Sequence, residues 1–133
     1  AHMRVLRRIF FLLLAVLLLT GCQPRKTGLF SSLDIDKDGL LYGYEIFIVK
    51  GDRAAGAESD YYAIVQCANG KISQPLIGQV VMTSDQVIIT LPAHGKPGCP
   101  SSQFTGTIGF KELTGNFSNG KELALSRKDS YWE

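Results

Sequence analysis

Three aspartates at alternate positions, Asp34, Asp36 and Asp38, are the residues whose types and spacing best fit a chemical function. In a tight turn, alternate side chains converge on one point. Three carboxylates held close together need a hard cation to offset their mutual repulsion, and oxygen ligands of this kind suit Ca²⁺. The spacing of Asp34, Asp36 and Asp38 therefore predicts calcium as a cofactor.

The twelve residues from Asp34 to Glu45 resemble the calcium loop of the EF-hand family. The aspartates fall at loop positions 1, 3 and 5, and Gly39 falls at the sharp turn. Leu40 stands where that family uses a backbone carbonyl, and Glu45 stands where a bidentate carboxylate closes the loop. The resemblance implies a structural calcium site at residues 34–45.

The segments on either side of this loop allow a second interpretation. The incoming segment, Thr27 to Leu33, is hardly two turns of helix. The outgoing segment, Tyr42 to Val49, is rich in aromatic and β-branched residues and predicts a strand. Along a strand Glu45 would point away from the loop. An Asp/Gly-rich turn that leads into a strand needs no metal, so both interpretations stay open.

Residue patterns typical of enzymes are scarce in this chain. The candidate base for a nucleophile is His94, in a loop rich in proline and glycine, and no serine has the flanking glycines of a nucleophile elbow. No sequence pattern places the possible paired carboxylates in a common cleft: Glu58, Asp60 and Glu112. There is no Gly-rich phosphate loop and no CxxC pair. We therefore expect a protein without catalytic residues.

The N-terminal segment has the features of a secretory signal peptide. Three arginines precede an unbroken apolar run from Ile9 to Leu19, and small residues follow directly before Cys22. A run of eleven residues is shorter than the roughly 20 that a membrane-spanning helix needs. Leu-Thr-Gly-Cys resembles the lipobox of bacterial lipoproteins, which implies that Cys22 receives lipid and becomes the first residue of the mature chain. An uncleaved anchor helix is the alternative.

The residue after Cys22 bears on the location of the protein. In lipoproteins of diderm bacteria, an aspartate at this position tends to retain the protein in the inner membrane. Gln23 stands here instead. The resemblance therefore implies a lipid-anchored protein in the outer membrane that faces the periplasm.

Two cysteines remain once Cys22 is lipidated. Cys67 and Cys99 form an even pair in an oxidising compartment, where disulfides persist. A catalytic thiol and a zinc site are the alternatives. No histidine lies near Cys67, and the two cysteines with His94 make a poor tetrahedral ligand set. We favour a Cys67–Cys99 disulfide.

The rest of the sequence divides into a tether and one domain. We assign residues 1–3 to a cloning remnant, 4–21 to the signal peptide, 22–29 to a tether without fixed structure and 30–133 to a β-domain. Of the 14 basic residues, three lie in the signal, which leaves 11 against 12 acidic residues. This near-neutral balance offers no basic surface for nucleic acid.

Short apolar runs separated by turn residues predict a mainly β fold, a small antiparallel barrel or sandwich. The late strands alternate, with Phe104, Gly106, Ile108 and Phe110 on one face. Tyr131 and Trp132 are expected to plug an open end of the barrel. Seven strands are expected: 40–49, 61–68, 76–83, 86–91, 104–110, 113–118 and 121–127.

The size, compartment, disulfide and β-content are similar to those of membrane-bound lysozyme inhibitors and of immunity lipoproteins that guard against wall-degrading toxins. This resemblance implies a binding module with a protein partner in the periplasm. The alternative is a structural envelope lipoprotein whose calcium loop rigidifies the domain and that has no soluble partner.

Overall fold

The computed structural model of this chain describes residues 1–19, 21–93, 99, 103–118, 120 and 122–131. It contains one helix, α1 (His2–Leu19), followed by a β-domain. In the described residues no helix is long and apolar enough to cross a membrane. The strands are β1 (Gly28–Ser31), β2 (Asp34–Ile35), β3 (Leu41–Lys50), β4 (Tyr61–Gly70), β5 (Leu76–Thr83), β6 (Gln86–Thr90), β7 (Gln103–Ile108), β8 (Glu112–Phe117) and β9 (Glu122–Lys128).

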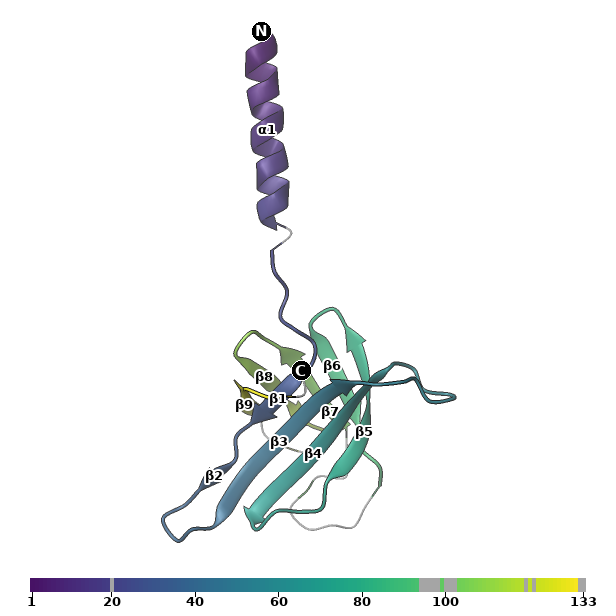
Figure 1. Cartoon of the computed structure of the whole chain (residues 1–133). Coiled ribbons are helices and arrows are strands. Elements are labelled where there is room, and N and C mark those ends of the chain that lie inside the picture. The colour runs from purple at the N-terminus through teal and green to yellow at the C-terminus, as the bar shows by residue number, and fades with distance from the viewer. Residues whose placement is uncertain (20, 94–98, 100–102, 119, 121, 132–133) are drawn as a thin grey trace.

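The strands form a closed antiparallel barrel, which confirms the predicted fold class (Figure 1). Each strand from β3 to β8 pairs with the next one along the chain. The short strand β1 pairs with β3 on one side and with β9 on the other, so eight strands close the barrel. The ninth, β2, extends the hairpin with β3. The sequence predicted seven strands, and β1 and β2 are the two that it missed.

Alternate residues of the strands fill the interior of the barrel. An eight-stranded barrel is just narrow enough for side chains to occupy its centre. The fully buried set is apolar and comes from every barrel strand. Its largest members are Phe30, Phe104, Phe117, Ile46, Ile48, Ile89, Leu113 and Leu125.

The up-and-down order gives the barrel two distinct ends (Figure 1). We call one the anchor end, because the chain arrives there from residue 22 to begin β1. The turns after β3, β5 and β7 lie at this end, as does the end of β9. We call the opposite one the far end, where the β2–β3 hairpin lies and where β4, β6 and β8 end.

Two of the predicted positions for aromatic residues are wrong. Phe110 does not continue the buried face of β7, because that strand ends at Ile108 and Phe110 lies in the following turn with 62% of its surface exposed. Tyr131 is fully exposed and plugs no opening. Trp132, the other residue expected to plug the barrel, lies outside the described residues.

A pair of facing glycines makes room for an aromatic ring in the interior. Gly106 on β7 is directly opposite Gly115 on β8, and the ring of Phe104 occupies the space that their side chains would take. A Cβ added to Gly115 would lie 2.6 Å from Gly106 Cα and 2.8 Å from Phe104 Cζ, and it would also clash with the Thr105 carbonyl oxygen. These contacts are with backbone and with a buried ring, which cannot move aside cheaply.

We expect Gly115→Ala to lower the free energy of unfolding by about 1–3 kcal/mol, the usual cost of overpacking a filled core. Gly51→Ala is the matched control, because its Cβ would make only an ordinary 3.5 Å contact with the Tyr62 ring. Urea denaturation of both variants checks this. Equal unfolding midpoints for the two variants would show that the Gly106–Gly115 contact is not tight.

Candidate functional site

Asp36 closes the turn between β2 and β3 through backbone and side-chain hydrogen bonds. Its N–H donates to the Leu40 carbonyl oxygen at 2.8 Å, and its own carbonyl oxygen accepts from Gly39 N–H at 3.1 Å. Its Oδ1 accepts from the N–H groups of Asp38 at 2.8 Å and Leu40 at 2.9 Å. Gly39 has φ +79°, a conformation that glycine adopts without steric cost. The carboxylate of Asp36 thus stabilises the hairpin itself.

The other predicted calcium ligands are spread along the hairpin. Asp34 pairs with Tyr42, and its Oδ1 accepts from Ile35 N–H at 2.8 Å. Glu45 lies farther along β3, between Ser31 and Gln66. Because paired residues share a face and faces alternate along a strand, Glu45 projects from the face of β3 opposite to that of Asp34.

This arrangement bears directly on the calcium prediction. Within the described part of the chain, no three or more His, Cys, Asp or Glu side chains are grouped so that they could hold a metal ion. The strand predicted for residues 42–49 is present as β3, and it carries Glu45 away from the three aspartates. Calcium binding by Asp34, Asp36, Asp38, Leu40 and Glu45 stays a prediction, and the metal-free hairpin is its competitor.

A disulfide joins the far end of β4 to the connection between β6 and β7. Cys67 and Cys99 are linked with an S–S distance of 2.00 Å and a Cα–Cα distance of 5.3 Å, as the even cysteine pair predicted. Both residues are buried. Closing a loop across a sequence separation of 32 stabilises the folded state by about 3.5–4 kcal/mol in the chain-entropy account.

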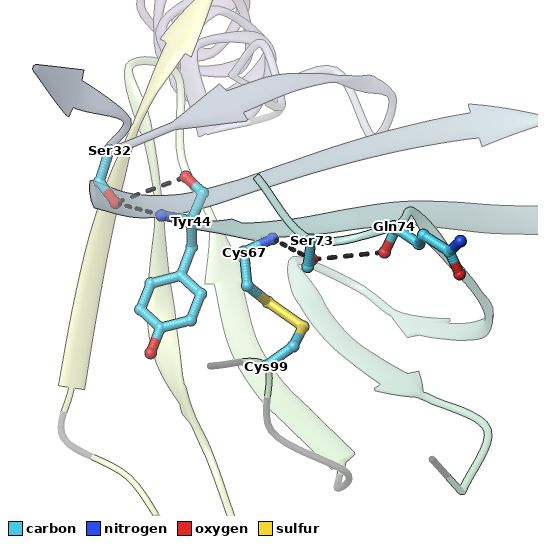
Figure 2. The surroundings of a disulfide bond; sticks show 6 residues. All are labelled: Ser32, Tyr44, Cys67, Ser73, Gln74 and Cys99. Carbon is cyan, nitrogen blue, oxygen red and sulfur yellow. Dashed lines mark hydrogen bonds between the residues drawn. A yellow bond between two sulfur atoms is a disulfide. The ribbon is translucent and has the colours of Figure 1, made fainter. Parts of the chain in front are cut away.

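Hydrogen bonds hold the backbone around Cys67, one end of this disulfide (Figure 2). Ser73 Oγ accepts from Cys67 N–H at 3.2 Å, and Ser73 N–H donates to the Cys67 carbonyl oxygen at 2.8 Å. Tyr44 is directly opposite Cys67 on β3, and its N–H donates to Ser32 Oγ at 3.1 Å. Cys67 is therefore fixed between β3 and the segment that leads into β5, and the disulfide ties Cys99 to it, which fits a structural role. His94, considered above as a base for a nucleophile and as a zinc ligand, lies outside the described residues.

At the anchor end, Arg127 holds the segment that leads from Cys22 into β1. Its guanidinium donates to the carbonyl oxygens of Arg25 and Thr27, both at 2.8 Å, and to that of Gly109 at 3.2 Å. It also lies 4.6 Å from the centre of the buried Phe30 ring, within cation–π range. Residues 25–27 are thus bound to the barrel, whereas the sequence predicted a tether of residues 22–29 without fixed structure. Cys22 itself is exposed, with a free thiol.

A row of apolar side chains crosses the outer wall of the barrel. Leu29, Phe47, Ile64 and Ile77 are directly opposite one another on β1, β3, β4 and β5, and all four alternate with buried residues. We call this set the apolar row. Ile77 is 67% exposed and the other three are half-buried. The outer faces of β7 and β8 differ, because polar pairs such as Thr105–Asn116 and Thr107–Thr114 occupy them.

Sequence reasoning missed the apolar row, although a signal for it was present. A strand with one face on the core and the other in solvent alternates apolar with polar residues. The run Ile46-Phe47-Ile48-Val49 is apolar at four successive positions, so β3 has apolar residues on both faces. Ile64-Val65 on β4 and Leu76-Ile77 on β5 repeat the pattern. Such strands in a barrel with a filled interior must expose one apolar face.

Comparison with known families gives one result. Residues 7–23 match the family of the prokaryotic membrane lipoprotein lipid attachment site, a range that includes Cys22. No curated protein and no solved structure matches the chain. The match supports the predicted signal peptide and a lipid-anchored envelope lipoprotein, with the barrel following the anchor.

The two interpretations of the acidic loop differ in the roles they give to Asp36 and Asp38. If the hairpin binds no metal, Asp36→Ala should cost about 0.5–1.5 kcal/mol through the loss of an acceptor for two N–H groups. Asp38→Ala, the matched control, should then leave stability unchanged. If calcium binds, with a dissociation constant of about 10⁻⁴ to 10⁻³ M, each substitution should remove the thermal shift that calcium gives the parent protein.

Thermal denaturation of the parent and both variants, at zero and 10 mM calcium with magnesium as control, separates these cases. A calcium-dependent shift that Asp38→Ala removes would support the metal site. Identical melting of the parent with and without calcium would contradict it.

Proposed function

We propose that this lipoprotein is a binding module that faces the periplasm from the outer membrane and takes a protein partner on its apolar row. The observation that carries the proposal is the alignment of Leu29, Phe47, Ile64 and Ile77 across four adjacent strands. Apolar side chains aligned across neighbouring strands mark an interaction surface more often than isolated exposed residues do. A barrel whose centre is filled by side chains binds a partner through its wall or its ends.

The class of partner follows from the resemblance to inhibitor and immunity lipoproteins. A periplasmic wall-degrading enzyme or toxin is the protein that such a module would bind. The small size of the domain and its lipid anchor suit a protein that holds its partner close to the membrane. We assign no catalytic residue and expect no turnover of a substrate.

The location in the outer membrane follows from the residue after the lipidated cysteine. Gln23 replaces the aspartate that tends to retain lipoproteins of diderm bacteria in the inner membrane. On this account the acyl chains lie in the inner leaflet of the outer membrane and the barrel lies in the periplasm. The alternative function is a structural envelope lipoprotein without a soluble partner, in which a calcium-bound loop rigidifies the fold.

A charge introduced into the apolar row should weaken partner binding. Ile77→Glu places a carboxylate on the most exposed member of the row, and burying it unpaired against a partner is costly. We expect at least a tenfold loss of affinity, which corresponds to about 1.4 kcal/mol. Thr105→Glu, on the polar outer face of β7, is the matched control and should bind as the parent does.

The measurement is quantitative capture from periplasmic extract with the parent, Ile77→Glu and Thr105→Glu proteins, followed by titration with the captured protein. A stoichiometric partner lost only with Ile77→Glu supports the binding module. The absence of a stoichiometric partner would favour the structural alternative. Equal capture by all three proteins would remove the apolar row as the binding surface.

A further inference from the structure

We propose that the anchor end of the barrel is itself a membrane-contact surface. The occupant of this surface is the bilayer that holds the acyl chains of Cys22. Phe110 enters its headgroup region, and Arg127 fixes the orientation of the barrel by holding the segment after Cys22. The proposal depends on the lipid anchor and not on the protein partner, so either proposal can fail without the other.

The first support is the short distance between the lipid and the folded domain. Cys22 is three residues from Arg25, and a fully extended chain spans at most about 11 Å over that interval. Arg25 is bound to Arg127 through its carbonyl oxygen, and so is Thr27. Only this short stretch separates the lipid from the folded domain, so the anchor end must lie close to the bilayer surface.

The segment on either side of Arg25 also lies beside the turns of the barrel. Four of its residues line one pocket together with Ser84 and Asp85 of the β5–β6 turn and with Ile108 at the end of β7: Cys22, Gln23, Pro24 and Lys26. The lipid-bearing residue therefore lies over the anchor end, so the acyl chains leave the protein beside the turns of this end.

The second support is the exposed aromatic side chain next to the Arg127 contacts. Phe110 has 62% of its surface exposed and lies between Gly109 and Lys111. The Gly109 carbonyl oxygen accepts from the Arg127 guanidinium, and the Lys111 carbonyl oxygen accepts from Arg127 N–H at 2.7 Å. The turn that contains Phe110 is thus hydrogen-bonded to Arg127, which also binds residues 25–27.

An exposed phenylalanine is unfavourable in water and favourable at the boundary between headgroups and acyl chains. Tyr131, fully exposed, follows β9 at this same end, and aromatic residues of this kind concentrate at membrane interfaces. Charge contributes less, because Lys26 and Lys111 are offset by Asp85 and Glu112, and Arg25 and Lys128 are partly offset by Asp129, which leaves only a small positive excess at this end. The contact should therefore depend on the anchor and on aromatic insertion rather than on anionic lipid.

The test uses the full lipidated protein in vesicles of phosphatidylethanolamine and phosphatidylglycerol, with nitroxide labels at Phe110→Cys and Ile72→Cys. Ile72 lies at the far end and is 55% exposed, so it is a matched control. A non-reducing digest confirms that the Cys67–Cys99 disulfide is intact in both labelled proteins. The label at 110 should collide with oxygen dissolved in the bilayer and be protected several-fold from a water-soluble nickel reagent, whereas the label at 72 should not be.

Equal exposure of the two labels to the nickel reagent would overturn the proposal. Protection at 110 that is found with phosphatidylglycerol but lost in pure phosphatidylcholine vesicles would also overturn it, because that result would mean attraction by charge. Arg127→Gln should keep the protein on the vesicles through its lipid and reduce the protection at 110. Protection unchanged by Arg127→Gln would remove Arg127 as the orienting residue.

Discussion

The barrel depends on the pairing of one four-residue strand with two others. β1 bonds to β3 along one edge and to β9 along the other, and without it both strands would present open edges. Phe30 of this strand is fully buried in the core, and Arg127 of β9 covers its ring while holding residues 25–27. The same short segment therefore closes the sheet, fills the centre and ties the fold to the lipid-bearing Cys22.

Most of the fold could be predicted from local patterns. Phe104, Gly106 and Ile108 share one face of β7, Leu113 and Gly115 share one face of β8, and this pattern together with turn residues marked the two strands. β1 was missed because Gly28–Ser31 is too short to show the alternation of apolar and polar residues that marks a strand. It is a strand because it pairs with β3 and β9, which lie up to about 20 and 100 residues away in the sequence. Phe110 was placed inside because alternation alone cannot show where a strand stops.

The candidate sites were predictable to different degrees. The lipobox and the cysteine pair depend on residue type and compartment, so Cys22, Cys67 and Cys99 could be assigned without coordinates. Residue type alone could not decide whether the acidic loop binds calcium. The spacing that suits a metal also suits an Asp/Gly turn, in which the Asp36 carboxylate accepts hydrogen bonds from backbone N–H groups. The contacts of Arg127 and the alignment of the apolar row are products of barrel closure, which brings together residues distant in sequence.

The central claim is that a lipid on Cys22 carries this barrel at a membrane surface. The most direct measurement is mass spectrometry of the N-terminal peptide of the protein isolated from membrane fractions. We expect the chain to begin at Cys22 with acyl groups attached, and more than one, because a single chain binds a bilayer only marginally. Membrane-bound protein that retains residues 4–21 and carries an unmodified Cys22 would contradict this account.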